Sequence, residues 1–177
     1  MTYITEQIER SVPMFKRMFT TRSITFSAMI AAIYAVLTIA LPVLSYGAGS
    51  GWECRISEAL TVLPILFPES IPGLTIGCLI ANLLSPVGPL DVIFGTIATL
   101  LAAIGTYLLR STPVLAALCP VFSNTIIIGT LLSYTYHLPL LFTMLQVGIG
   151  ELAAVLVGLL LVTVLKRAKL DTRLHTA

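Results

Sequence analysis

The chain has 177 residues, of which 57% are hydrophobic and only 10% are charged, and its formal net charge is +2. Soluble domains average about 25% charged residues, so this composition excludes an ordinary soluble domain and indicates an integral membrane protein. A membrane-crossing helix needs roughly 20 apolar residues, which leaves room for about five or six spans joined by short loops.

The N-terminal segment, residues 1–23, differs from the rest of the chain because charged residues interrupt it. These charges argue against a secretory signal, which needs an unbroken apolar core. Apolar residues recur at helical spacing opposite the charges: Ile4, Ile8, Val12, Phe15 and Phe19. This pattern predicts an amphipathic helix that lies in the cytoplasmic interface of the membrane.

Six apolar segments follow, and proline residues mark most of their ends, as expected for residues that start or stop helices. The predicted spans are residues 24–44, 55–67, 71–85, 90–109, 113–134 and 140–165. The second and third are short for a bilayer, so we expect them to be tilted, sheltered by their neighbours or extended into the loops. The predicted fold class is an all-α integral membrane bundle over residues 24–166, followed by a basic cytoplasmic tail over residues 167–177.

The basic residues predict the orientation of this bundle. With six spans, nine of the ten Lys and Arg residues fall on one side of the membrane: Arg10, Lys16, Arg17, Arg22, Arg110, Lys166, Arg167, Lys169 and Arg173. Only Arg55 falls on the other side, whereas five spans would scatter the basic groups to both sides. The positive-inside rule therefore places both termini in the cytoplasm.

Several polar side chains interrupt the apolar spans, mostly in the half of the membrane away from the basic residues. They are Arg55, Glu58, Asn82, Asp91, Asn124, Gln146 and Glu151. Ionisable groups inside a membrane cost several kcal/mol and usually face a cavity or a partner, so we expect these residues to converge on one pocket that opens outward. Glu151 is the hardest to explain otherwise, since it lies among apolar and small residues with no Lys or Arg within a turn.

Structural explanations remain open for the other members of this set. Arg55 and Glu58 are three residues apart, so they can form an ion pair at the rim. Asp91 begins a span, where a carboxylate stabilises the helix dipole. Asn82 and Asn124 are side-chain amides of the kind that bridge neighbouring spans.

The loop between the first two spans, residues 45–52, combines glycines with two aromatic residues, Tyr46 and Trp52. Glycines make the backbone adaptable, and flat aromatic faces suit a lid that stacks on an aromatic solute. The alternative is that the aromatic residues anchor the chain in the membrane interface.

The first span carries a stripe of small residues, Ala28, Ala31, Ala32 and Ala35. Small residues spaced four apart let another helix approach closely. The stripe therefore predicts either close packing within the chain or docking of an external partner.

Motifs for several other function classes are missing from the sequence. It contains no phosphate-binding GxxxxGK[ST] loop and no recognisable catalytic cluster, so we expect no enzyme activity and no cofactor. The three cysteines have no metal-ligand spacing, which favours apolar packing roles over a disulfide or metal site. The scarcity of exposed basic residues excludes nucleic acid as a partner.

Five segments together resemble a known family. They are residues 55–64 (RISEALTVLP), 71–74 (IPGL), 77–84 (GCLIANLL), 91–95 (DVIFG) and 147–151 (VGIGE). The first resembles the signature of QueT-type proteins, the queuosine-precursor substrate-binding (S) components of energy-coupling-factor (ECF) transporters. The resemblance covers roughly residues 28–166.

This resemblance implies a six-helix S component of the bacterial cell membrane that binds a solute from outside. It would dock on a membrane coupling subunit driven by two cytoplasmic ATPases, through an Ala-rich face of the first helix that here contains Ala28, Ala32 and Ala35. The implied solutes are deazaguanine precursors of queuosine, or queuine, released inside after the S component topples in the membrane. An S component for another vitamin-like solute, an independent small transporter and a membrane scaffold are the alternatives.

A deazaguanine offers adjacent N–H donors and a carbonyl acceptor, which a carboxylate and an amide can answer. Under this hypothesis Glu151 accepts from the donor edge, while Asn124 and Gln146 contact the remaining polar groups. Asp91 or Glu58 would then be available for a cationic aminomethyl substituent.

The remaining residues of the hypothetical site have supporting roles. Arg55 would orient Glu58, and Trp52 or Tyr46 would cover the ring of the solute.

Overall fold

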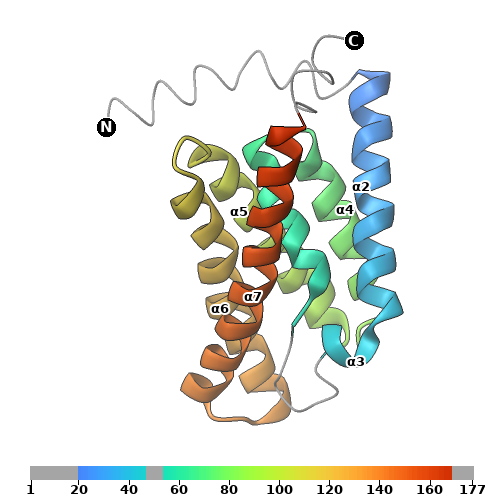
Figure 1. Cartoon of the computed structure of the whole chain (residues 1–177). Helices are drawn as coiled ribbons and strands as arrows, with labels where there is room; N and C mark the ends of the chain where they lie inside the picture. The colour runs from blue at the N-terminus through green and yellow to red at the C-terminus, as the bar shows by residue number, and fades with distance from the viewer. Residues whose placement is uncertain (1–19, 47–53, 169–177) are drawn as a thin grey trace.

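A computed structural model describes residues 20–46 and 54–168, and every regular element in these ranges is helical. The elements in Figure 1 are α2 (Thr21–Ala40), α3 (Pro42–Ser45), the 3₁₀ helix η2 (Ile56–Ile65), α4 (Ser70–Asn82), α5 (Pro89–Leu108), α6 (Pro113–Tyr136) and α7 (Leu140–Arg167). Most of the expected interfacial helix, residues 1–19, and most of the basic tail, residues 169–177, lie outside the described residues.

Four of these helices, α2, α5, α6 and α7, are long and apolar enough to cross a membrane. The shortest of them have 20 residues, which at about 1.5 Å per residue gives a length of roughly 30 Å, the thickness of a bilayer core. Large apolar side chains cover their outer faces, among them Val36, Leu141 and Leu160. The protein is therefore a multi-pass membrane protein.

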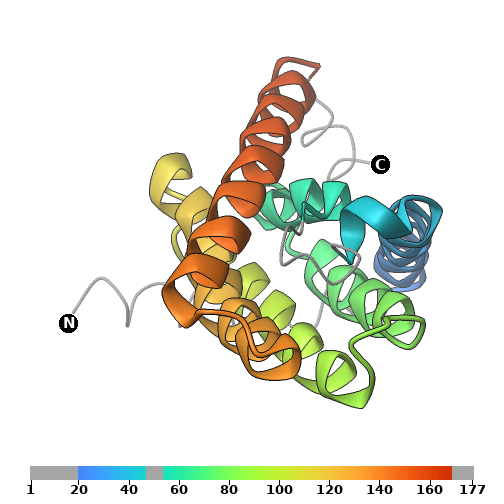
Figure 2. The same cartoon turned by 90° about the horizontal axis from the view of Figure 1, so that it is seen from below.

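The helices form a closed ring when the bundle is viewed along its length (Figure 2). In order around the ring, α2 packs on α4, α4 on α5, α5 on α6, α6 on α7, and α7 on η2, which returns to α2. The helix η2 also contacts α4, α5 and α6, so its residues form much of the core that the other helices enclose.

The second and third predicted spans are the two short elements, and η2 differs from the expectation in its type. Its ten residues form a 3₁₀ helix, which rises about 2.0 Å per residue and so covers about 20 Å. All residues from Ser57 to Ile65 are buried. Irregular or non-α backbone at membrane depth is tolerated where protein surrounds it, and here the neighbouring helices surround this short helix.

The close contact between α2 and α4 accounts for two of the four alanines in the small-residue stripe of α2. A Cβ added to Gly77 of α4 would come 2.8 Å from the carbonyl oxygen of Ala31, so the two backbones approach as closely as a glycine allows. Ala31 and Ala35 are buried in the bundle, and they serve packing within the chain. Ala28 and Ala32 remain on the exposed face of α2.

The helix ends agree with the predicted spans to within a few residues, with one exception caused by proline. The first span ends as a helix at Ala40, because Pro42 begins the separate short helix α3.

Pro120 lies inside α6, where it cannot donate to the carbonyl oxygen of Ala116. The hydroxyl of Thr106 on α5 donates to that oxygen at 3.1 Å, so the freed acceptor is satisfied by a neighbouring helix.

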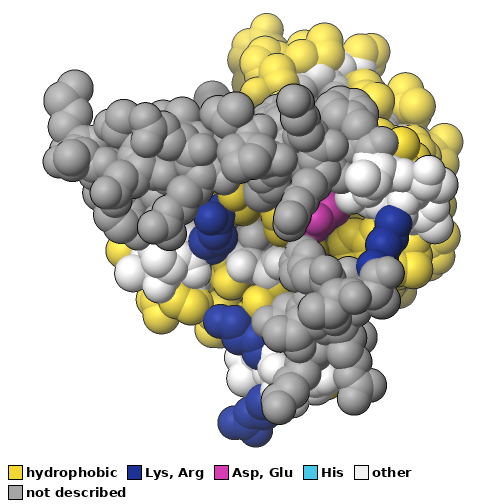
Figure 3. All heavy atoms as spheres, turned by 90° about the horizontal axis from the view of Figure 1, so that it is seen from above, with side chains coloured by type: hydrophobic (Ala, Val, Ile, Leu, Met, Phe, Trp, Pro, Cys, Tyr) yellow, Lys and Arg dark blue, Asp and Glu magenta, His cyan; other side chains and the backbone are white. Residues whose placement is uncertain are grey.

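The described basic residues are concentrated at one end of the bundle (Figure 3). Arg22 begins α2, Arg110 lies in the turn between α5 and α6, and Lys166 and Arg167 end α7; these helix ends lie together at the top of Figure 1. Arg55 lies at the start of η2, toward the opposite end. The two ends of the molecule therefore differ in charge as the sequence predicts.

Candidate functional site

A narrow cavity lies inside the bundle between η2, α5, α6 and α7. Its walls are formed by Arg55, Glu58, Gly95, Thr99, Asn124, Ile128, Val147 and Glu151. Its volume is about 10 Å³, which is room for about one water molecule. A solute larger than water can therefore enter only if these walls move apart.

Glu58 is fixed at one wall of this cavity by η2 and α2. The hydroxyl of Tyr34 on α2 donates to its Oε1, and the hydroxyl of Thr61 donates to its carbonyl oxygen at 2.6 Å. Its other carboxylate oxygen, Oε2, has no hydrogen-bond partner among the described residues. Since Thr99 and Asn124 line the cavity beside it, this oxygen belongs to a polar pocket rather than to the apolar core.

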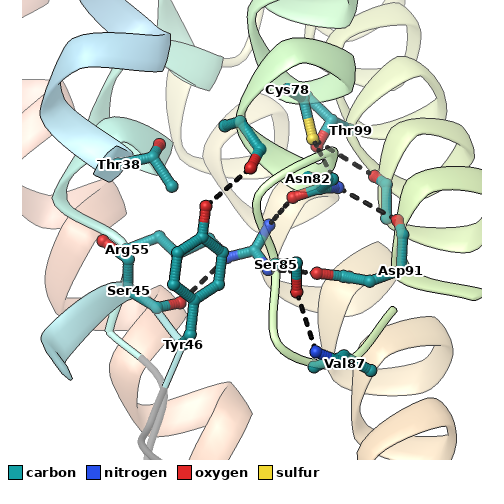
Figure 4. A network of polar contacts seen from close by, with 12 residues as sticks. Thr38, Ser45, Tyr46, Arg55, Cys78, Asn82, Ser85, Val87, Asp91 and Thr99 are labelled. Carbon is teal, nitrogen blue, oxygen red and sulfur yellow. Dashed lines mark hydrogen bonds and ion pairs between the residues drawn. The ribbon is translucent and has the colours of Figure 1, made fainter. Parts of the chain in front are cut away.

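Arg55 is the centre of a buried polar network that joins four elements (Figure 4). Its Nε donates to the carbonyl oxygen of Ser45 at 3.1 Å, its Nη1 to Asn82 Oδ1 at 3.0 Å and its Nη2 to Asp91 Oδ2 at 3.0 Å. The guanidinium also lies 5.5 Å from the ring centroid of Tyr46, within the range of a cation–π interaction. Arg55 thus holds α3, η2, α4 and α5 together behind the cavity wall.

This network changes the expected roles of two acidic residues. Among the described residues, the carboxylate that forms an ion pair with Arg55 is that of Asp91 rather than that of its near neighbour Glu58. Arg55 thus engages Oδ2 of Asp91, while Oδ1 of the same carboxylate has no hydrogen-bond partner among the described residues. The same contacts show that Arg55 orients Asp91 and Asn82 directly, while Glu58 is oriented by Tyr34.

Asn82 and Gly95 complete the network on α4 and α5. Asn82 Nδ2 donates to the carbonyl oxygen of Asp91 at 3.0 Å, so this side chain both accepts from Arg55 and ties α4 to α5. A Cβ added to Gly95 would come 2.5 Å from Asn82 Nδ2 and 2.8 Å from Asp91 Oδ1. Only glycine leaves room at this position for the network beside the cavity.

The opposite wall belongs to α6 and α7. Asn124 and Glu151 are both buried and line the cavity together with the apolar side chains of Ile128 and Val147. Gln146 is buried five residues before Glu151 on α7, and its Oε1 has no hydrogen-bond partner among the described residues. It does not line this cavity, so the structure brings together two of the three residues expected to contact the solute.

Cys54 lies at the edge of the site, next to the start of η2. Its thiol donates to the carbonyl oxygen of Gly150 at 3.6 Å. Partial burial raises the pKa of this thiol, and the nearby carboxylate of Glu151 raises it further. Both effects favour the neutral thiol over the thiolate.

The polar residues that the sequence predicts for the site thus fall into two groups, those that line the cavity and those in the hydrogen-bond network beside it. Arg55, Glu58, Asn124 and Glu151 line the cavity, and Arg55 connects it to Asn82, Asp91 and Tyr46. The hydroxyl of Tyr46 donates to the carbonyl oxygen of Ala81 at 2.7 Å, which fixes this ring beside Arg55. Trp52 lies outside the described residues.

Sequence reasoning missed Tyr34 and Thr99. Tyr34 is fully buried in the middle of α2, and the signal for it was a phenol hydroxyl in an otherwise apolar span, which requires a partner. Thr99 lines the cavity and donates to Cys78 Sγ at 3.2 Å, and a single threonine in an apolar helix gives no signal of such a role.

Comparison with known proteins identifies the family. The sequence matches the family model described as QueT transporter over residues 24–167, a range that includes all six predicted spans. No curated protein and no solved structure matches the chain. The matched range contains nearly all of the four long apolar helices and every residue that lines the polar cavity. The chain belongs to the QueT transporter family and is therefore a membrane transporter and not an enzyme.

Proposed function

We propose that this protein is the S component of an ECF importer and captures a queuosine precursor, a deazaguanine or queuine, from outside the cell. The observation that carries the proposal is the buried cavity with carboxylates and an amide on its walls, in a chain that belongs to the QueT transporter family. Such groups are costly in a membrane unless they serve a ligand or a partner.

The cavity offers the chemistry that a deazaguanine needs. In this proposal Glu151 accepts from the adjacent N–H donors of the heterocycle, and Asn124 contacts its carbonyl group; both residues line the same space. Ile128 and Val147, which also line it, would pack on the flat apolar faces. Gln146 would join the site when the walls separate, and Trp52 would cover the solute.

The proposed topology has six spans with both termini in the cytoplasm. The four long helices provide four spans, and η2 and α4 provide two short ones that their neighbours shelter. Because Arg22, Arg110, Lys166 and Arg167 would face the cytoplasm under the positive-inside rule, the mouth of the site would face the exterior.

The transport step requires partners in this proposal. The chain would dock on a membrane coupling subunit driven by two cytoplasmic ATPases, through the exposed part of the small-residue stripe, Ala28 and Ala32. Solute release would then follow when the docked S component topples in the bilayer.

The test is binding by the purified full chain in detergent, measured by isothermal titration calorimetry. Deazaguanines should bind, whereas riboflavin, thiamine and biotin should not. In liposomes the chain alone should not carry the solute, but it should do so with the coupling subunit, the ATPases and ATP. Binding of a different vitamin would indicate an S component of another specificity, transport without ATPases would indicate an independent transporter, and no binding at all would favour a scaffold.

Glu151→Gln should weaken deazaguanine binding about 10- to 100-fold, because a lost hydrogen bond to a charged group costs about 1.5–3 kcal/mol. Glu69→Gln, the same change at a half-exposed position at the opposite end of the bundle, is the matched control. Unchanged affinity of the Glu151→Gln variant would refute the role proposed for Glu151.

A further inference from the structure

The hydroxyl of Tyr34 connects α2 to the cavity, although Tyr34 is not among the residues that line it. Tyr34 is 0% exposed, and its hydroxyl donates to Oε1 of Glu58. Glu58 belongs to η2, is 2% exposed and forms part of the cavity wall. A buried phenol hydroxyl needs a hydrogen-bond partner, and here that partner belongs to the site itself.

A second hydrogen bond joins α2 and η2 next to this one. Thr38 Oγ1 lies 2.7 Å from Oγ of Ser57, the residue before Glu58. Thr38 also donates to the carbonyl oxygen of Tyr34 at 2.9 Å, and Thr38 and Ser57 are fully buried. Two consecutive residues of η2 are therefore held by α2, which fixes the direction of the Glu58 side chain.

This arrangement determines which oxygen of Glu58 a solute can meet. Tyr34 occupies Oε1, so a solute in the cavity would contact Oε2. Thr99 and Asn124 are polar side chains close to this carboxylate and line the same cavity, and the guanidinium of Arg55 acts on the carboxylate electrostatically. Glu58 thus offers the cavity a hydrogen-bond acceptor whose direction is set from outside the site.

The position of Glu58 indicates which part of a base it would contact. Glu58 lies on the η2 wall of the cavity, and Glu151 lies on the wall of α6 and α7. In the proposed function Glu151 accepts from the pyrimidine edge of a deazaguanine. The five-membered ring lies at the other end of the base, and its pyrrole N–H, like the indole N–H of tryptophan, is a donor only. A carboxylate oxygen on the η2 wall is the complementary group.

We infer that Tyr34 is a positioning residue of the solute site, which directs Glu58 toward the pyrrole N–H of the base and so makes the site specific for solutes that carry this donor. The inference rests on the proposed function, in which Glu151 and Asn124 bind the other edge of the heterocycle. Tyr34 touches no solute and acts only through Glu58.

The experiment compares deazaguanine with its furopyrimidine isostere, in which a ring oxygen replaces the pyrrole N–H, by calorimetry on the purified full chain. The unaltered protein should bind deazaguanine about 10- to 100-fold more tightly, as expected for a hydrogen bond to a charged group. Tyr34→Phe should reduce this preference at least about threefold, because Glu58 is no longer held in direction. Tyr134→Phe, the same change at an exposed position of α6, should retain it. General damage to the bundle would weaken both ligands alike and leave the preference unchanged.

A second pair of variants tests whether Tyr34 acts through Glu58. Glu58→Leu should reduce the preference to within about threefold, because it removes the acceptor. Adding Tyr34→Phe to Glu58→Leu replaces both members of the hydrogen bond by apolar groups, which can be nearly neutral for stability. The double variant should bind each ligand as Glu58→Leu does, since the effects of two residues in one hydrogen-bond pair do not add. These two variants decide the matter even if Tyr34→Phe alone does not fold.

The outcomes separate this inference from the function on which it rests. Equal binding of both ligands by the unaltered protein would overturn the inference and leave the proposed function standing, whereas binding of neither would overturn both. A full preference in Tyr34→Phe or in the double variant would also overturn the inference, as would a further loss of affinity when Tyr34→Phe is added to Glu58→Leu. Glu151→Gln should weaken both ligands alike, and a loss confined to deazaguanine would assign the pyrrole N–H to Glu151 instead.

Discussion

The pKa of the Cys54 thiol, at the edge of the site, is sensitive to the carboxylate of Glu151. Partial burial and the Glu151 carboxylate both raise the pKa of its thiol, and the thiolate is the reactive form. In a Cys78→Ala, Cys119→Ala protein, alkylation of Cys54 should therefore be slow at neutral pH and should accelerate up to a higher pH than for an unperturbed thiol. Glu151→Gln removes one of the two causes, so it should move the rate–pH profile toward lower pH.

The measurement is the rate of reaction with iodoacetamide across a pH series, followed by mass spectrometry. Glu69→Gln, which changes an acid far from the thiol, should leave the profile in place. If the profiles of the Glu151→Gln variant and its parent coincide, the carboxylate does not act on this thiol.

At the scale of single residues, the sequence predicted which polar side chains are buried but not how they pair. Arg55 and Glu58 are three apart, which suggests a helical ion pair. Arg55 instead precedes η2 with an extended backbone, φ −77° and ψ 106°, so its side chain leaves the helical register and reaches Asp91, 36 residues away. Such a contact depends on the packing of α4 and α5, which spacing along the chain does not specify.

At the scale of elements, the apolar segments and their prolines predicted the positions of the six main helices, but not that the second is a 3₁₀ helix. Its pattern does not distinguish the two helix types, and tertiary contacts decide between them. At Gly158, α7 comes so close to η2 that an added Cβ would collide with the carbonyl oxygen of Ala59. The burial of η2 and the close approach of its neighbours are properties of the assembled ring.

The exposed face of α2 provides a test of the proposed docking. Ala28→Trp and Ala32→Trp place a bulky side chain on a surface where a partner helix would approach closely. Each should reduce ATP-dependent uptake in liposomes at least about tenfold, as expected if close approach is lost, and should leave solute binding by the isolated chain unchanged.

Ala153→Trp, at an exposed alanine of α7, is the matched control and should retain uptake. If all three variants transport equally well, α2 is not the docking surface. Reduced solute binding by the α2 variants would instead indicate damage to the bundle.

At the scale of the whole molecule, the distribution of basic residues predicts which end faces the cytoplasm. Single cysteines in a background without Cys54, Cys78 and Cys119 can test this. His137→Cys, in the turn between α6 and α7, should react in intact cells with a membrane-impermeant maleimide. Ser111→Cys, in the turn between α5 and α6, should react only after the cells are permeabilised. The reverse labelling pattern would invert the topology, and labelling of both from outside would rule out the proposed spans.

The concentration of basic residues at one end of the bundle could be predicted from the sequence. It depends only on how many apolar segments separate one basic residue from the next. The closure of the ring could not be predicted in this way, since it requires η2 to lie between α2 and α7. The pattern of apolar residues does not specify which helices pack against each other, because lipid and protein interiors are similarly apolar environments for Leu, Ile and Val.

The two walls of the cavity differ in how far a substitution in them disturbs the rest of the bundle. The wall of η2 is tied into a network in which Arg55 holds three other elements, so a substitution there disturbs the assembly of the bundle. The wall of α6 and α7 contributes Asn124, Val147 and Glu151 to the cavity. Substitutions on the α6–α7 wall should therefore change the shape and polarity of the cavity with less disturbance of the bundle than substitutions on the η2 wall.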